Sequence, residues 1–383
     1  MSATLRLDAQ RIPAMRAAEA GEGPHRVPRT IEVLDYHTAG EPFRIVTSGL
    51  PGIPGRTILE RRRHLRDDHD AVRRLLMWEP RGHADMYGGV LVPPDHDEAV
   101  CGVLFLHNEG YSTMCGHGTI ALGTALIETG AIPCDGRATR FGIDAPCGLL
   151  QVEARVDAGE AEAAEREGRT PRVREVAFEN VPSFAAALDA TLDVPGYGEV
   201  RFDVGYGGAF YAILPAARMG IELDRARTPE LVAAARALVD AGRAALREGG
   251  AAAERLGVAH PESDLAFLYG AILTGPAEDP GHTDRNLCIF ADGEVDRSPT
   301  GSGVSARLAV AHARGEVEVG EPVAVESILG RDAVFTGRIV RSESWDGRTA
   351  IVPEVRGSAH VAGRAAFVLA EGDTVGRGFL LPR

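Results

Sequence analysis

The chain has 383 residues, of which 44% are hydrophobic and 25% are charged, and this length suffices for two domains with separate cores. Its formal net charge of −14 disfavours nucleic acid and anionic membrane surfaces as partners, because both repel an acidic protein. The composition therefore indicates a globular protein that acts on a small molecule.

Residues 1–28 contain neither an apolar h-region nor a small-residue cleavage site, so they do not resemble a secretory signal. No stretch approaches the roughly 20 apolar residues that a membrane span requires. We therefore expect a cytoplasmic protein without a membrane partner. Residues 1–28 form an N-terminal extension, and the sequence leaves open whether this extension is ordered.

The first part of the chain alternates short strands with one charged helix. Residues 30–46 contain two β-rich runs around Gly-Glu-Pro, which predicts a hairpin. Residues 60–78 predict a single charged amphipathic helix, and strands are expected near 88–93 and 102–107.

The rest of the chain continues in the same manner. Strands are expected at 149–156, and the Ala/Glu-rich residues 157–170 should form a solvated excursion between strands. Residues 173–214 predict a further group of strands, and 228–247 predict a helix with Ala and Leu on its inner face. Because the strand pattern returns over 287–383, the fold class is α+β with many antiparallel strands.

An internal repeat is the strongest organisational signal. Ser112–Leu122 and Arg297–Arg307 share the pattern x-G-x-G leading into a helix. The helices predicted behind them, Thr119–Glu128 and Val304–Arg314, are each followed by a glycine that can end a helix. Each half of the chain is therefore expected to bury one central helix within its own strands.

Both copies of the repeat can bind an anion. Their glycines let backbone N–H groups approach a ligand closely, and the helix that follows adds partial positive charge at its N-terminus. We call residues 115–118 the first cradle and residues 300–303 the second cradle. Two such cradles could hold one carboxylate and stabilise charge that develops on it.

The two cradles begin with different residues. At Cys115 the helix terminus and His117 should lower the thiol pKa from about 8.5, so that a thiolate can act as a base. The corresponding residue of the second cradle is Thr300, and a hydroxyl is no base near neutral pH without a strong activator. The site therefore has one thiol and not two.

None of the five cysteines forms a CxxC pair or has zinc-finger spacing beside a histidine. A disulfide framework and a structural zinc site are therefore disfavoured, and the histidines show no metal-binding spacing. We predict no metal and no cofactor. Besides Cys115, the cysteines are expected to be small core residues: Cys101, Cys134, Cys147 and Cys288.

Several motifs together resemble the proline racemase family, from about residue 30 to the end of the chain. They are HTAGEPFRIV (37–46), LPGIPG (50–55), HNEGYSTMCGHGTIAL (107–122), YGGAFYA (206–212) and ADGEVDRSPTGSGVSA (291–306). In proline racemases and hydroxyproline 2-epimerases of this family both cradles begin with cysteine. The dehydratase branch of the family resembles this chain in having threonine at the second.

The resemblance implies two pseudo-symmetric domains of the diaminopimelate-epimerase/proline-racemase type, each with a curled, mainly antiparallel sheet around a central helix. The first domain would contain residues 29–194 and 351–383, and the second residues 195–350. The site is expected in the cleft between them.

The resemblance also implies roles for individual residues. Cys115 would transfer the proton, Thr300 would orient substrate or water, and Asp296 would meet the ring ammonium. Backbone N–H groups would hold the substrate carboxylate at the remaining cradle positions, namely Gly116, His117, Gly301 and Ser302. Asp296 could instead serve only to begin a turn.

The expected activity is dehydration of trans-3-hydroxy-L-proline to Δ1-pyrroline-2-carboxylate, with an imino acid as the small-molecule partner. A hydroxyproline 2-epimerase or a proline racemase is the alternative, and a non-catalytic imino-acid-binding protein is a further one. A cysteine hydrolase is disfavoured because Cys115 and His117 are too close in sequence for a typical dyad. Nucleotide binding is disfavoured because neither cradle has the P-loop lysine or the Rossmann spacing.

The sequence leaves some features unassigned. It does not determine the oligomeric state, and a homodimer is one possibility. The pocket for the ring hydroxyl is also open, with Tyr206, Phe210 and Tyr211 as candidate walls, although aromatic residues near a glycine turn more often pack than contact a ligand.

Overall fold

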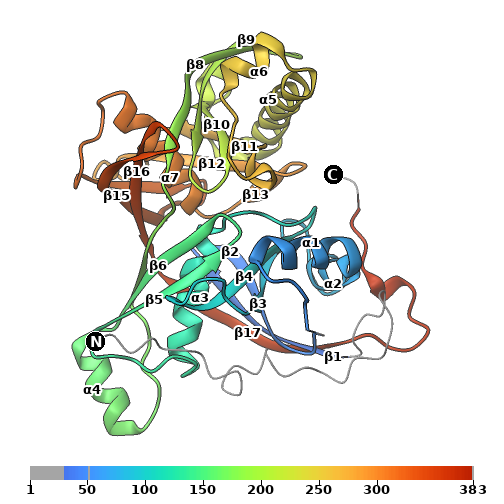
Figure 1. Ribbon diagram of the computed structural model, residues 1–383, viewed down its shortest axis with the longest axis vertical. Helices are drawn as coiled ribbons and strands as arrows, with labels where there is room; N and C mark the ends of the chain where they lie inside the picture. Colours follow the sequence, from blue (N-terminus) through green and yellow to red (C-terminus); the bar gives the residue numbers. More distant parts are fainter. Residues whose placement is uncertain (1–29, 51, 382–383) are drawn as a thin grey trace. The chain divides into compact units, whose positions relative to one another are not determined.

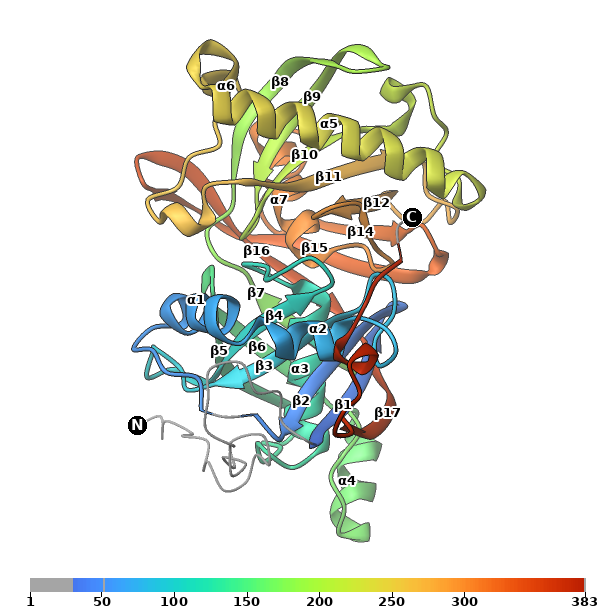
Figure 2. The same cartoon turned by 90° about the vertical axis from the view of Figure 1, so that its right-hand side faces the viewer.

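The computed structural model describes residues 30–50 and 52–381, so the N-terminal extension 1–28 lies outside the described residues. Within this range the chain forms two compact units (Figures 1 and 2). The first unit contains the described residues up to Thr113, His117–Phe178 and the segment from Ser358 onward. The second contains Met114–Gly116 and Glu179–Gly357.

The passages between the units differ from those predicted near residues 195 and 350. The chain enters the second unit after Phe178 and leaves it after Gly357. Strand pairing explains both positions, because β8 (Phe184–Val194) pairs with β9 (Gly198–Tyr206) and β16 (Arg348–Gly357) pairs with β15 (Gly330–Trp345). Both pairings lie within the second unit, which keeps β8 and β16 there.

The sheet of the first unit runs in the order β17–β1–β2–β3–β4–β5–β6. Its helices include the central α3 (Gly116–Glu128), in which every residue up to Ile127 is buried. The strands are β1 (Thr30–Thr38), β2 (Glu41–Ser48), β3 (Tyr87–Val92), β4 (Ala99–His107), β5 (Ala138–Ala145), β6 (Gly148–Arg155) and β17 (Ala359–Val368). The other elements are α1 (Ile58–Asp68), α2 (Asp70–Met77), α4 (Ala158–Glu167), β7 (Glu175–Glu179), which the chain follows into the second unit, and the 3-10 turn η5 (Val375–Arg377).

The sheet of the second unit runs β8–β9–β10–β11–β12–β14–β15–β16, with β13 paired to β12. The central helix α7 (Gly301–Ala313) packs against β8, β9, β10, β15 and β16, and α5 (Thr228–Glu248) covers β11 and β8 (Figure 2). The remaining strands are β10 (Phe210–Pro215), β11 (Leu268–Gly275), β12 (Asp284–Phe290), β13 (Glu294–Asp296) and β14 (Pro322–Ser327). The remaining helices are α6 (Gly250–Leu256), η2 (Ala216–Met219), η3 (Arg225–Arg227) and η4 (Ser263–Leu265).

The two units repeat one strand pattern. Along β1–β2–β3–β4–β5–β6 the successive pairings are antiparallel, parallel, antiparallel, parallel and antiparallel. Along β9–β10–β11–β12–β14–β15 they follow the same alternation. In both series the central helix comes between the fourth and fifth strands. The predicted α+β fold, with two pseudo-symmetric halves around central helices, is thus confirmed.

The helix predicted over 60–78 was wrong in its continuity. His69 has φ −133° and ψ 22°, which ends α1 and begins α2. Asp70 starts α2, where its carboxylate accepts hydrogen bonds from Nε and Nη2 of Arg73 at 2.6 and 2.9 Å. An acidic residue in the first turn favours a new helix start. Downstream, the solvated excursion at 157–170 contains the mostly exposed helix α4, while the predicted hairpin and the helix over 228–247 are confirmed.

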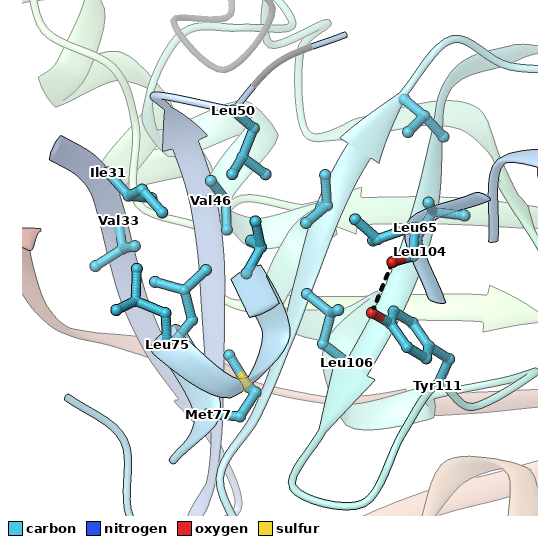
Figure 3. Packing of buried hydrophobic residues seen from close by; sticks show 14 of the residues in the cluster. Ile31, Val33, Val46, Leu50, Leu65, Leu75, Met77, Leu104, Leu106 and Tyr111 are labelled. Atoms are coloured by element: carbon cyan, nitrogen blue, oxygen red, sulfur yellow. Dashed lines mark hydrogen bonds between the residues drawn. The ribbon is translucent and has the colours of Figure 1, made fainter. Parts of the chain in front are cut away.

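Apolar side chains from α1 and α2 pack onto the sheet of the first unit. Figure 3 shows Leu65 and Leu75 of these helices with Val33, Val46 and Leu104 of the strands. All five are less than 6% exposed. This cluster holds α1 and α2 against β4. Polar side chains of the two helices therefore reach the loop that follows β4. Across residues 30–50 and 52–381, no helix is both long and apolar enough to cross a membrane.

Both units contain the same contact between a buried carboxylate and a more exposed histidine, which we call the clasp. In the first unit Asp144 on β5 accepts hydrogen bonds from the backbone N–H of Asp95 and His96 and contacts Nδ1 of His96 at 2.7 Å. In the second unit Glu326 on β14 accepts from the backbone N–H of Glu278 and Asp279, and contacts Nδ1 of His282 at 2.8 Å. Each clasp holds the loop between the third and fourth strands of its series, β3–β4 or β11–β12.

Candidate functional site

Cys115 lies in a fully buried stretch of chain between β4 and α3. Residues 111–127 are all buried, and the Cys115 side chain is 3% exposed. Two of the other thiols are poor candidates for a base, because burial raises the pKa of Cys101 and of Cys147 to about 12. Cys288 is a buried residue inside β12, as predicted for a core cysteine.

His117 is held by residues of the first unit. The Thr38 hydroxyl donates to its carbonyl oxygen at 3.0 Å, and its imidazole meets the rings of Tyr87 and Phe43 edge-on, with centroids 4.8 and 5.9 Å away. The side chain is 3% exposed. The imidazole therefore packs among aromatic rings while the backbone of the first cradle forms the start of α3. Thr38 and Phe43 belong to the motif at 37–46, which explains why that motif accompanies the cradle.

At the second cradle a chain of hydrogen bonds links Asp296, Ser298 and Thr300. The Thr300 hydroxyl donates to Oδ2 of Asp296 at 2.8 Å, and the Ser298 N–H donates to Oδ1 of Asp296 at 2.7 Å. The Thr300 N–H donates to the Ser298 hydroxyl at 3.1 Å. All three residues are buried. Asp296 therefore does form a turn, the alternative raised above, but its second oxygen is directed at the cradle.

Thr300 does not cap the helix that it precedes. A threonine at this position normally accepts a hydrogen bond from an N–H of the first turn, whereas the Thr300 side chain makes no such bond. The first internal bond of α7 runs from the Val304 N–H to the Thr300 carbonyl at 2.8 Å. The N–H groups of residues 301–303 therefore precede the internal hydrogen bonds of α7, where an anion can accept them.

Gly116 lies against Gly301 within the second unit. Met114–Gly116 groups with the second unit, and a methyl group on Gly116 would lie 2.5 Å from the Cα of Gly301. No side chain fits at such a separation. The structure thus brings Cys115 and Gly116 into the same unit as Thr300 and Gly301, although these signature segments are far apart in the sequence.

The YGGAFYA motif packs against the first turn of α7. Gly207 is so close to the Ser302 carbonyl that no larger residue fits there. The Tyr211 hydroxyl lies 2.7 Å from the Ser302 hydroxyl, and both side chains are at most 2% exposed. Burial, with Cys288 and Tyr269 nearby, raises the pKa of Tyr211 well above its ordinary value, so the tyrosine stays protonated. Tyr206 and Phe210 pack against each other with ring centroids 4.8 Å apart.

Sequence reasoning missed two features of this site. Ser298 was not singled out, although the spacing Asp-x-Ser-x-Thr is a signal for side chains that bond to nearby backbone N–H groups. Tyr211 was considered only as a pocket wall, and nothing in the sequence links it to Ser302.

Within the described residues, no group of three or more His, Cys, Asp or Glu side chains is arranged to bind a metal ion. The roles given to the cradle residues and the lack of a cofactor remain predictions.

The sequence matches the family model described as Proline racemase over residues 33–380. A relative named Trans-L-3-hydroxyproline dehydratase, from Xenopus tropicalis, is 44% identical over 361 residues, which covers 94% of this chain and 97% of the relative. A relative named 3-hydroxyproline 2-epimerase, from Burkholderia multivorans, is 42% identical over 357 residues and covers 93% and 99%. Sequence similarity of this extent includes both cradles.

Among solved structures, a hydroxyproline epimerase from Agrobacterium vitis with bound trans-4-hydroxy-L-proline resembles this chain with a TM-score of 0.79 at 29% identity. The match covers 92% of this chain and 96% of that one. Similarity of sequence and of structure therefore extends over nearly all the described residues and both strand series.

Proposed function

Because this chain belongs to the proline racemase family, we propose that it is a trans-3-hydroxy-L-proline dehydratase, a cofactor-independent lyase that forms Δ1-pyrroline-2-carboxylate. The observation that carries the proposal is Thr300 at the head of the second cradle, with its hydroxyl proton donated to Asp296 at 2.8 Å. Inversion at Cα needs a base on one face and an acid on the other, and Thr300 supplies neither near neutral pH. Elimination needs a catalytic residue on only one face of the ring, and Cys115 can supply it.

The substrate is held through its charges. Backbone N–H groups at Gly116, His117, Gly301 and Ser302 bind the carboxylate, and the positive N-termini of α3 and α7 favour that negative charge. The Asp296 carboxylate pairs with the ring ammonium of the substrate and also accepts the hydrogen bond from the Thr300 hydroxyl. When the Cα proton is removed, negative charge spreads onto the substrate carboxylate. The backbone N–H groups of the two cradles stabilise that charge, because they already bind the carboxylate before the reaction.

The chemistry is an elimination on one face of the ring. In trans-3-hydroxy-L-proline the hydroxyl is trans to the carboxylate and therefore lies on the same face as the Cα hydrogen. The Cys115 thiolate takes the Cα proton, the electron pair forms the Cα–C3 double bond, and the C3–O bond breaks. The Cys115 thiol then gives its proton to the departing hydroxide, which leaves as water. The enamine product tautomerises to Δ1-pyrroline-2-carboxylate in solution.

An epimerase is the competing function, since the Burkholderia multivorans relative carries that name. An epimerase would return the Cα proton from the opposite face and retain the hydroxyl. The two activities thus differ in product and in the fate of deuterium taken from the solvent.

The test is to incubate the protein with trans-3-hydroxy-L-proline in deuterated buffer and to follow the reaction by proton NMR. We expect substrate loss with formation of Δ1-pyrroline-2-carboxylate, and Cys115→Ser should lower the rate by about 100- to 10,000-fold. Cys134→Ser is the matched control, because Cys134 is a partly exposed thiol outside both cradles. Inversion with deuterium at Cα and no loss of water would instead identify an epimerase.

A further inference from the structure

We propose that Arg62 and Arg73 are positioning residues that fix the loop leading to Cys115 and so set the place of its thiol. The inference rests on the proposed role of Cys115 as the base. We call this arrangement the arginine clamp, consisting of the two guanidinium groups and the carbonyl oxygens of His107, Asn108 and Tyr111.

Arg73 is the better anchored of the two arginines. It is 6% exposed, and its Nε and Nη2 bind both oxygens of Asp70 at 2.6 and 2.9 Å. Its remaining nitrogen, Nη1, donates to the carbonyl oxygens of His107, at 3.1 Å, and of Asn108. One face of the guanidinium lies over the Trp78 ring at 5.5 Å. Only a planar fork can meet a carboxylate on one side and two carbonyls on the other.

Arg62 holds the other end of the same loop. It is 7% exposed, and its Nη2 donates to the Tyr111 carbonyl at 2.6 Å. The Tyr111 hydroxyl in turn reaches the Leu65 carbonyl at 3.2 Å, the contact drawn in Figure 3, and lies 3.2 Å from Asp70. Tyr111 is therefore fixed by its backbone and by its side chain.

Asn108, at the Arg73 end of the loop, is also held through its side chain. Its amide donates to the carbonyls of Met77 and His83 at 2.7 and 3.1 Å, and its side-chain oxygen accepts from the Asp85 N–H at 2.6 Å. The indole N–H of Trp78 donates to the Asn108 carbonyl at 2.7 Å. The loop is thus fixed at its Asn108 end through both the backbone and the side chain, and at Tyr111 by Arg62.

Burial of two cations at this loop requires a reason beyond packing. Removing a guanidinium from water is costly unless hydrogen bonds and an opposite charge compensate. Here the acceptors are backbone carbonyls of one loop, so the interaction constrains the backbone and not merely a pair of side chains. Tyr111 is followed by Ser112–Met114, all buried, and then by Cys115. A fixed Tyr111 therefore leaves the thiol little freedom relative to the start of α3.

The test compares Arg73→Lys with Arg74→Lys on the same helix. Lysine keeps the charge but cannot bind Asp70 and two carbonyls together. Arg74 is 46% exposed and pairs with the same Asp70 at 3.4 Å, so it serves as the control for a change at the carboxylate alone. We expect Arg73→Lys to lower kcat by about 10- to 100-fold, as displacement of a reacting group by about 1 Å does, with KM changed less than about threefold. Arg74→Lys should change neither value more than about twofold.

The second readout does not depend on turnover. Alkylation of Cys115 by iodoacetamide is followed by mass spectrometry against pH, without substrate, in the wild type and both variants. A thiol displaced from the N-terminus of α3 loses its stabilising dipole, so Arg73→Lys should shift the alkylation profile to higher pH. A fall in kcat with an unchanged alkylation profile would overturn the proposal, and so would an unchanged kcat.

Two further variants keep the test decisive. If Arg73→Lys fails to fold, Trp78→Phe removes the indole donor to Asn108 and part of the ring that faces Arg73, and a smaller change in the same direction is expected. An unaltered Trp78→Phe profile then counts against the clamp. Cys115→Ser tests the base itself: if that variant keeps its activity, the proposed role of Cys115 as the base fails, whereas the alkylation profiles of the wild type and the arginine variants still report on the clamp.

Discussion

Thr300 has an unusual backbone conformation and a side-chain hydroxyl that is hydrogen-bonded to Asp296. Its φ of +62° is rare for a residue with a branched side chain, and its hydroxyl donates to Asp296. The strain is compensated by this bond and by the Ser298 contact to its N–H. The residue at this point can therefore change its chemistry while the turn stays fixed, provided that its side chain can still donate to Asp296.

A single substitution should add a second acid or base at this position. Thr300→Cys places a thiol at the head of the second cradle, and we expect it to introduce deuterium at Cα with inversion when the substrate is incubated in deuterated buffer. Dehydration should fall by about tenfold, since the thiol donates more weakly to Asp296. Thr300→Ser is the control and should remain a dehydratase. A cysteine variant that only loses activity would argue that Thr300 does not decide between the two reactions.

At the scale of elements, β10 contacts the first turn of α7 through the side chain of Tyr211. The Tyr211 hydroxyl lies 2.7 Å from that of Ser302, and the T-shaped contact with Tyr269, with centroids 5.8 Å apart, fixes the tyrosine ring. In the first unit Tyr87 on β3 meets the ring of His117, the residue that corresponds to Ser302. Each cradle is thus held at the same position by a tyrosine from a neighbouring strand, although by different contacts.

Removal of the Tyr211 hydroxyl tests this support. Tyr211→Phe should raise KM and lower kcat/KM by about tenfold, because a less well fixed first turn of α7 holds the substrate carboxylate less firmly. The free energy of unfolding should fall by only about 1 kcal/mol, the usual loss for one hydrogen bond. Steady-state kinetics and urea unfolding measure the two effects, with Tyr197→Phe, a half-buried tyrosine of the β8–β9 turn, as the control. Equal losses in both variants would contradict the assignment.

The elements also show how far sequence patterns reach. The glycine pattern, the following helices and the repeat are local features, and all of them could be read directly from the chain. The run at 60–78 was predicted only as a charged amphipathic helix, and that pattern does not indicate that Arg62 and Arg73 are buried. Their acceptors lie 49 residues away for Arg62 and 34 to 35 residues away for Arg73, so no local pattern indicates that a buried partner exists. The contact between Tyr211 and Ser302 could not be predicted for the same reason, because the two residues are 91 positions apart in the sequence.

At the scale of the whole molecule, the clasp recurs in each strand series. Burial raises the pKa of Glu326, but hydrogen bonds from the backbone N–H groups of Glu278 and Asp279 and from His282 outweigh it, so the pKa is lowered. A carboxyl group whose pKa is lower in the folded than in the unfolded state stabilises the fold above its unfolded pKa. This contribution is lost as the pH falls through the folded pKa.

Glu326→Gln should therefore destabilise the protein at neutral pH more than in acid. We expect a loss of about 2 kcal/mol at pH 7, since charged hydrogen bonds are replaced by neutral ones. The difference from the wild type should shrink as the pH is lowered below about 4. Urea unfolding at several pH values gives both quantities. Asp144→Asn, the matched change in the first unit, should cost a similar amount at pH 7, and a constant difference at every pH would refute the linkage for Glu326.

The repeated strand series has a consequence for how such a site can change during evolution. Two copies of one half, made as separate identical chains, would always carry the same residue at both cradle heads, and any mutation would alter both together. Once the halves are joined in one chain, each head is encoded separately. Cys115 can then be kept while its counterpart becomes Thr300. With Cys115 as the proposed base, joining the halves in one chain is what permits a base at one cradle head alone, because asymmetry of function requires that the two halves be free to diverge.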